Sequence, residues 1–308
     1  MLDKKCILVG IPLDCGKVTK GCVMGPDAYR TVGLFEVIQN LGYEVFDFGN
    51  VSPETFDSVD VDNLEPYKLN ENIAWTGAIA QIAKKQMQFG LPIFMGGDHA
   101  VSMGSVSGVA AYAATQNRPL FVLWLDAHSD FHTPQSTKSG NLHGTPMAYF
   151  TGQAGFEKFP ELEVIVDPRN VFMIGLRSVD HPEKEALDAL SISIADMRFI
   201  DEFGIKPSLL QFLARVRDSN GLLHVSFDVD FLDPMIAPAV GTTVPGGATI
   251  REAHLTMELL HDSGLVTSLD LVELNPMLDE NGKTAKLMVD LTASILGKRI
   301  FDKPTGSL

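Results

Sequence analysis

The chain has 308 residues, of which 45% are hydrophobic and 20% charged, a size and balance that suit one large α/β domain or two small ones. Acidic residues outnumber basic residues by 39 to 24, which gives a formal charge of −15 and a pI near 4.9. This charge excludes nucleic acid, an anionic membrane surface and phosphorylated polyanions as expected partners, because each would be repelled.

Short apolar segments alternate with longer amphipathic ones along the chain, a pattern typical of a parallel sheet covered by helices on both faces. Eight strands are predicted, at Cys6–Ile11, Glu44–Phe48, Pro92–Met95, Leu120–Leu125, Val171–Gly175, Met197–Ile200, Leu222–Phe227 and Ser268–Leu274. Seven helices are predicted, at Asp27–Leu41, Asn70–Phe89, Ser102–Thr115, Pro182–Leu190, Pro207–Asp218, Thr249–Asp262 and Lys283–Leu296. Pro26-Asp27 and a capping box at Thr249 and Glu252 support two of the helix starts. No linker, repeat or low-complexity tract interrupts this order, which predicts a single domain over residues 1–308.

Side chains that bind metals follow three of the predicted strands. Asp126, His128 and Asp130 alternate after the fourth strand, Asp228 and Asp230 after the seventh, and His99 follows Gly96-Gly97-Asp98 after the third. In an extended chain, residues two apart point to the same side. The carboxyl ends of the strands also border the binding crevice in open α/β sheets. A single Asp-x-Asp is often only a solvated loop start, but three such clusters indicate a site.

These six side chains, four of them carboxylates, are too many for one tetrahedral zinc and suit two hard divalent ions. The sequence therefore predicts a two-metal hydrolase. The loop from Thr133 to Pro146 and the glycine-rich run from Gly241 to Gly247 are the expected rims of its pocket.

With these residues in place, the chain resembles the ureohydrolase superfamily, and within it the arginases. The matching segments run in the family's order over almost the whole chain: Gly96–His99, Asp126–Asp130, Ser139–Gly144, Gly175–Asp180, Ser226–Pro234 and Leu271–Pro276. The Ser139–Gly144 loop favours arginase over agmatinase. The resemblance implies a three-layer α/β/α sandwich with an eight-stranded, mostly parallel sheet.

The resemblance also implies two Mn²⁺ ions per subunit. One would be bound by His99, Asp126, Asp130 and Asp228, and the other by Asp126, His128, Asp228 and Asp230, so that Asp126 and Asp228 bridge. The implied reaction is hydrolysis of L-arginine to L-ornithine and urea, by attack of a metal-bridging hydroxide on the guanidinium carbon. Four carboxylates cancel the charge of two Mn²⁺, and the hydroxide leaves a negative site that suits a cationic guanidinium.

Further residues take roles from the same resemblance. Glu273 matches the carboxylate that pairs with the guanidinium, His143 matches the proton shuttle, and Asp130 counts among the catalytic residues as well as the ligands. In the outer pocket Ser139 and Asn141 offer donors to the substrate's α-carboxylate, and Asp180 and Glu183 offer acceptors to its ammonium. His132 stands where most arginases have Asn, and its imidazole can still donate to the carboxylate. Thr242 matches a threonine near the guanidinium.

Two alternatives to arginase stay open: another ureohydrolase, such as an agmatinase or guanidinobutyrase, and a catalytically silent relative kept as a structural module. Co²⁺ and Fe²⁺ remain alternatives to Mn²⁺. The family implies a homo-oligomer, a trimer or a hexamer. His181 and His254 are expected on the surface or in a helix, and Met257, Leu259 and Leu260 in the core.

No run of about 18 apolar residues is present, and the amino terminus enters a strand without the hydrophobic segment of a signal peptide. The three cysteines, Cys6, Cys15 and Cys22, are odd in number and lie within the first 22 residues. They therefore predict neither a disulfide framework nor a zinc finger. We expect a soluble cytoplasmic protein in which these thiols have no ligand role.

Overall fold

All eight strands lie parallel in one sheet, in the order β2-β1-β3-β8-β7-β4-β5-β6. The computed structural model describes residues 4–53 and 66–299. The strands are β1 (Lys5–Gly10), β2 (Glu44–Asn50), β3 (Leu91–Met95), β4 (Leu120–Leu125), β5 (Val171–Ile174), β6 (Ser193–Ala195), β7 (Leu222–Asp228) and β8 (Val266–Val272). The last strand in the sequence, β8, thus lies in the middle of the sheet, between β3 and β7.

Ten α-helices occur in the described ranges. They are α1 (Gly25–Thr31), α2 (Leu34–Asn40), α3 (Leu69–Gln86), α4 (Val101–Thr115), α5 (Pro146–Phe150), α6 (His181–Asp188), α7 (Met197–Phe203), α8 (Ile205–Asp218), α9 (Ile250–Ser263) and α10 (Lys283–Ile295). Short 3₁₀ turns lie at Cys22–Met24, Pro168–Asn170, Val229–Phe231 and Pro276–Leu278. The capping box predicted at Thr249 and Glu252 begins α9, and none of the helices is long and apolar enough to span a membrane.

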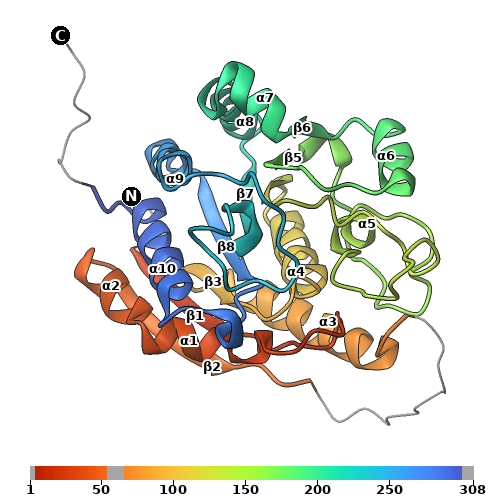
Figure 1. The fold of residues 1–308 in the computed structure, drawn as a ribbon, viewed down its shortest axis with the longest axis horizontal. Helices are drawn as coiled ribbons and strands as arrows, with labels where there is room; N and C mark the ends of the chain where they lie inside the picture. Colours follow the sequence, from red (N-terminus) through yellow and green to blue (C-terminus); the bar gives the residue numbers. More distant parts are fainter. Residues whose placement is uncertain (1–3, 54–65, 300–308) are drawn as a thin grey trace.

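The helices form two layers with the sheet between them, as the sequence predicted (Figure 1). Figure 1 shows α9 and α10 on one side of the strands, and α4 and α5 on the other. Each strand contributes to two apolar cores because successive side chains point to opposite faces. In β4, Phe121, Leu123 and Leu125 join the core under α1, α2, α8, α9 and α10. Leu120, Val122 and Trp124 join the core under α3, α4 and α5.

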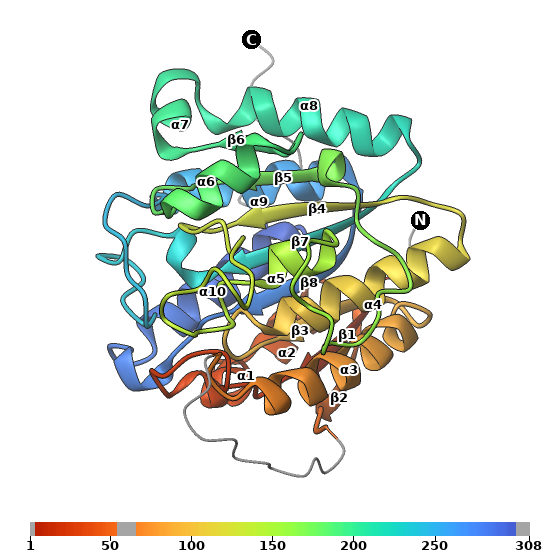
Figure 2. The same cartoon turned by 90° about the vertical axis from the view of Figure 1, so that its right-hand side faces the viewer.

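The predicted strand at Met197–Ile200 is wrong, because these residues begin helix α7. Asp196 caps this helix by accepting a hydrogen bond from the Phe199 backbone N–H at 2.7 Å. The sixth strand is instead Ser193–Ala195, three residues at the edge of the sheet. The view in Figure 2 places β6 next to β5, directly below α8.

The predicted helix at Asp27–Leu41 is two helices, α1 and α2, separated by Gly33. Gly33 adopts φ 87°, a left-handed conformation that a helix interior does not allow and that glycine accepts without strain. The short helix α5 lies just beyond the loop predicted to form the pocket rim, and its first residue is Pro146.

The four central strands position the site. In the sheet order, β3, β8, β7 and β4 are neighbours. His99 follows β3, Glu273 follows β8, Asp228 ends β7, and Asp126 follows β4. Because carboxyl ends of parallel strands meet at one edge, residues far apart in the sequence converge there.

Candidate active site

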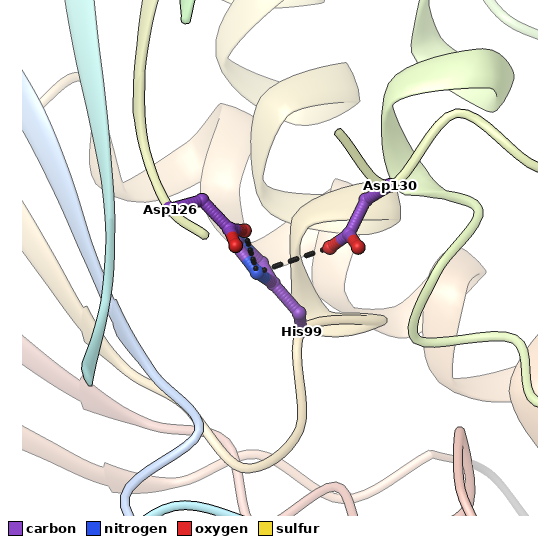
Figure 3. A group of neighbouring side chains, drawn as sticks. All are labelled: His99, Asp126 and Asp130. Carbon is purple, nitrogen blue, oxygen red and sulfur yellow. Dashed lines mark ion pairs between the residues drawn. The ribbon is translucent and has the colours of Figure 1, made fainter. Parts of the chain in front are cut away.

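The imidazole of His99 is held at the floor of the site by two neighbours. Its Nε2 lies 2.9 Å from Ser226 Oγ on β7, and its ring stacks on Trp124, with centroids 4.1 Å apart and planes 4° from parallel. These contacts leave Nδ1 to face the carboxylates, at 3.0 Å from Asp126 and 3.2 Å from Asp130 (Figure 3). Asp228 lies 2.9 Å from the same nitrogen.

Asp126 is shared between two groups of potential ligands. Its Oδ2 faces His99, and its Oδ1 lies 3.5 Å from Nδ1 of His128. Its two oxygens therefore point toward two different imidazoles, one in each of the groups His99, Asp126, Asp130 and Asp126, His128, Asp230. This is the geometry expected of a carboxylate that bridges two cations.

The turn after β7 fixes the other two carboxylates. Asp228 Oδ1 accepts a hydrogen bond from the Asp230 backbone N–H at 2.7 Å, and Asp230 Oδ1 accepts one from the Ala127 N–H at 2.9 Å. These bonds tie β7 to β4 and leave Asp230 Oδ2 3.0 Å from Nδ1 of His128. Both imidazoles thus present the same ring nitrogen to the carboxylates.

The buried carboxylates of this cluster give it a negative charge that bound cations would offset. Burial raises the pKa of Asp130 and Asp228 well above its ordinary value, and neighbouring carboxylates raise it further. The pKa of Asp230 is raised by burial and by the neighbouring carboxylate of Asp126. For Asp126, burial acts upward, but the facing imidazoles of His128 and His99 outweigh it and lower the pKa. His99 Nδ1 and Asp126 Oδ2 are also buried without a hydrogen bond in the described chain. Four carboxylates and two imidazoles therefore fit a pair of oxygen-preferring divalent ions.

A cavity of about 320 Å³ opens above this cluster. Every residue predicted for the site lines it except His99 and Asp126, which are fully buried. The lining comprises His128, Asp130, His132, Thr137, Ser139, Asn141, His143, Gly144, Ser178, Asp180, Glu183, Asp228, Asp230, Thr242 and Glu273. Both predicted rims contribute to it, the first with Thr137 to Gly144 and the second with Thr242.

Glu183 and Asp180, at the outer end of the cavity, differ in burial and in the hydrogen bonds that they accept. Glu183 is buried, and its oxygens accept hydrogen bonds from Ser129 Oγ at 2.7 Å, the Phe131 N–H at 2.9 Å and the Asp180 N–H at 2.9 Å. Asp180 is exposed, with 69% of its side chain accessible. Nε2 of His132 lies between them, 3.3 Å from Asp180 and 3.6 Å from Glu183. Asp180 is therefore the freer acceptor for a ligand.

Donors line another part of the cavity. Ser139 is exposed, lies 3.3 Å from Thr137 Oγ1 and accepts a hydrogen bond from the Asn141 N–H at 3.3 Å. The side-chain Oδ1 of Asn141 is buried without a hydrogen bond in the described chain. The Ser139 hydroxyl can donate to a ligand, whereas the unpartnered Oδ1 of Asn141 is an acceptor, and only the Nδ2 group of that side chain can donate.

Glu273 and His143 form a pair at the inner end. Oε1 of Glu273 lies 3.0 Å from Nδ1 of His143 and accepts a hydrogen bond from the His99 N–H at 2.9 Å. Glu273 has φ 67° and Asp130 has φ 48°. Left-handed backbone is uncommon for residues other than glycine and occurs at functional sites, where the surrounding structure holds it.

Sequence reasoning did not find Lys17, Ser226 or Trp124 as parts of the site. Lys17 is 2% exposed and forms an ion pair with Glu273. Burial acts against charging Glu273, but the Lys17 ammonium and His143 hold its pKa well below the ordinary value. A lone lysine in a loop carries no sequence signal for such a role. Ser226 could have been found, because it lies two residues before Asp228 and so points to the same side of β7.

The histidines without a predicted role lie outside the site. His181 begins α6 with an exposed side chain, and His254 in α9 contacts Ser294 Oγ at 2.9 Å. Met257 and Leu260 are fully buried, and Leu259 packs against the same core. Cys6, Cys15 and Cys22 are buried and form no disulfide.

The structure is thus a parallel α/β sheet with a buried His/Asp cluster, able to hold metal ions, at the carboxyl ends of its strands. The sequence profile of the Arginase family matches residues 4–297. An arginase of Brucella melitensis is 56% identical over 301 residues, which cover 97% of this chain and 98% of that protein.

Two solved structures extend the comparison. An arginase of Bacillus subtilis superposes with a TM-score of 0.88 at 35% identity, covering 96% of this chain and all of that one. An arginase of Entamoeba histolytica, solved in complex with L-ornithine, superposes with a TM-score of 0.85 at 26% identity, covering 97% of this chain and 100% of that one. The chain belongs to the arginase family, and it is an enzyme of the hydrolase class.

Proposed function

We propose that this enzyme hydrolyses L-arginine to L-ornithine and urea with two Mn²⁺ ions per subunit. The observation that carries the proposal is the pair of ligand groups that share Asp126 at the floor of a cavity with acidic and donor groups at its outer end. The relatives named arginase support the substrate, as does the ornithine bound to the Entamoeba structure.

The residues that would hold the ions are His99, Asp126, Asp130 and Asp228 for one, and Asp126, His128, Asp228 and Asp230 for the other. The ions would lower the pKa of a water molecule toward neutrality and so provide a nucleophile at working pH. The fit is one of charge: four buried carboxylates offset the four positive charges of two divalent ions.

His143 is the proposed proton donor to the leaving amine. Glu273 accepts from Nδ1 of its ring, so Nε2 is the nitrogen available to a ligand in the cavity. A histidine at this distance from a bound substrate can act as a general acid. Glu273 adds negative charge to the cavity wall where a guanidinium would lie.

The outer groups select an α-amino acid. Asp180 is the proposed acceptor for the substrate's ammonium, and Glu183 holds the turn that presents it. Ser139 and Asn141 are the proposed donors to the α-carboxylate. His132 and Thr242 complete the lining, with the His132 ring close to Asp180.

The test is release of urea by metal-reconstituted enzyme from L-arginine, agmatine and 4-guanidinobutyrate. We expect kcat/KM for arginine to exceed the other two by at least a hundredfold, about 2.7 kcal/mol of transition-state binding. A preference for agmatine or guanidinobutyrate would instead assign the enzyme to another ureohydrolase activity. No urea from any guanidine would favour a silent relative.

The same proposal includes a cytoplasmic location and a homo-oligomer, a trimer or a hexamer. The three unpaired, buried thiols support a reducing compartment. Metal analysis of the purified enzyme distinguishes Mn²⁺ from Co²⁺ and Fe²⁺, and light scattering gives the oligomeric state.

A further inference from the structure

Lys17 is a fully buried lysine whose ammonium has one carboxylate partner, Glu273. The side chains are 2% and 3% exposed. Lysine is almost never buried unless it is paired, and burial alone would lower its pKa. Here Glu273 reverses that effect and raises the Lys17 pKa above its ordinary value. The protein therefore keeps a full positive charge directly behind the inner wall of the cavity.

The loop that carries Lys17 is anchored on both sides. The Gly16 N–H donates to Asp98 Oδ2 at 2.7 Å, which fixes the loop to the end of β3. The Gly16 carbonyl accepts from the N–H groups of Leu142 and His143 at 2.6 and 3.0 Å. The residue next to Lys17 thus binds the backbone of His143 itself.

The Lys17 ammonium lies against Gly241, which has no side chain to occupy the space. A Cβ added to Gly241 would lie 2.9 Å from Lys17 Nζ, so a larger residue there would displace the ammonium. The ammonium therefore lies between the backbone of Gly241 and Oε2 of Glu273.

The two oxygens of Glu273 have separate partners as a result. Oε2 faces Lys17, with the Cys22 thiol 3.8 Å away. Oε1 accepts from His99 N–H at 2.9 Å and lies 3.0 Å from His143 Nδ1. Without Lys17, the hydrogen bonds that hold the carboxylate are both at Oε1, so the group can turn about that oxygen and Oε1 can shift away from the imidazole.

We propose that Lys17 is a positioning residue for His143, acting through Glu273: the ion pair at Oε2 turns Oε1 toward Nδ1, and this leaves Nε2 of His143 directed to the substrate. The kinetic part of this inference rests on the proposed function, and the orientation of Glu273 and His143 does not. In the part of the chain that the structure describes, Lys17 does not line the cavity, and its ammonium is paired with Glu273 rather than with a proposed metal ligand.

The experiment compares wild-type enzyme, Lys17→Met, Lys17→Arg and a control, Lys206→Met, which removes an exposed lysine of α8 far from this loop in the sequence. Each is reconstituted with Mn²⁺, checked by thermal melting and metal content, and assayed for urea release from arginine. We expect kcat of Lys17→Met to fall about a hundredfold, the effect of a catalytic group misplaced by about 1 Å. Lys17→Arg keeps the charge and should recover at least tenfold. Lys206→Met should match wild type.

A double-mutant cycle separates positioning from general stability. In a His143→Asn background, Lys17→Met should slow turnover less than threefold, because the group that Lys17 positions is already absent. An equal loss in both backgrounds, or wild-type kcat in Lys17→Met, would overturn the proposal. If Lys17→Met does not fold, the same cycle is run with Lys17→Gln, which is uncharged but retains an N–H donor.

A crystal structure of the Lys17→Met enzyme is the readout that needs no activity. We expect the distance from Glu273 Oε1 to His143 Nδ1 to exceed 3.5 Å, against 3.0 Å in the structure described above. An unchanged pair in that crystal would refute the inference whatever the substrate. Absence of urea release by wild type alone would refute only the proposed reaction.

Discussion

Removal of the metal ions should lower the thermal stability of this enzyme by a large, measurable amount. In the metal-free protein, Asp126, Asp130, Asp228 and Asp230 are nearly fully buried with only two imidazoles between them. Dialysis against a chelator leaves these charges to repel one another, and re-addition of Mn²⁺ should restore the melting temperature.

The size of the effect follows from linkage. At free Mn²⁺ a thousandfold above Kd, each site stabilises the folded state by about 4 kcal/mol, so two sites contribute about 8 kcal/mol. The entropy of unfolding near 60 °C is about 2 cal/mol/K per residue, or about 0.65 kcal/mol/K for 308 residues. The expected rise in melting temperature is therefore about 12 °C.

Differential scanning calorimetry measures the melting temperature, and metal analysis measures the number of ions bound per subunit. Asp126→Asn should lose more than half of the shift, because this carboxylate faces both ligand groups. The control Asp201→Asn changes an exposed aspartate in α7 and should keep the full shift. A metal-dependent shift below about 2 °C, or one unaffected by Asp126→Asn, would refute the two-ion assignment.

Three further predictions test other parts of the structure. Gly97→Ala should lower the free energy of unfolding by more than about 3 kcal/mol, seen in urea titration, because the new Cβ would lie 1.6 Å from the Leu13 carbonyl oxygen; a loss below 1 kcal/mol would contradict this. Ser139→Ala with Asn141→Ala should reduce kcat/KM for arginine at least tenfold more than for agmatine, which lacks the carboxylate, and equal losses would refute recognition by this loop. Asp270 is buried, yet hydrogen-bonded neighbours hold its pKa below the ordinary value, so its ionised form stabilises the fold above about pH 4 and that contribution is lost as pH falls through the lowered pKa. Asp270→Asn should therefore destabilise by about 2 kcal/mol at pH 7, and the difference from wild type should shrink below pH 4 in urea titrations; a difference that grows on acidification would be contrary evidence.

The strands and ligands that were predictable share a local signal. Asp126, His128 and Asp130 alternate directly after an apolar strand, so the period of two places them together without knowledge of the rest of the fold. Seven of the eight strands were predicted from another local signal, short apolar runs between longer amphipathic segments. The exception, Met197–Ile200, has apolar residues at strand-like spacing, but the cap at Asp196 starts a helix there. The edge strand is instead Ser193–Ala195, and its three residues are too few to form a recognisable apolar run.

The inner wall of the cavity was less predictable because non-local contacts form it. Glu273 was found only through the resemblance, since a single carboxylate after a strand is not distinctive. Its partner Lys17 lies 256 residues away in the sequence. The contact depends on strand order, which places β8 beside β3, and hydrophobic periodicity holds no information on that order. The stacking of His99 on Trp124 likewise depends on strand order, because β8 and β7 lie between β3 and β4 in the sheet.

The position of β8 also constrains how this chain folds during synthesis. The strand emerges from the ribosome after the other seven, yet it pairs with β3 on one side and β7 on the other. Until residue 272 is available, those two strand edges have no partner, and unpaired edges promote association between chains. Glu273 enters the site at the same moment, because it is the residue that follows β8. The completed site therefore marks the last step of sheet assembly, and chains that stop short of β8 should aggregate.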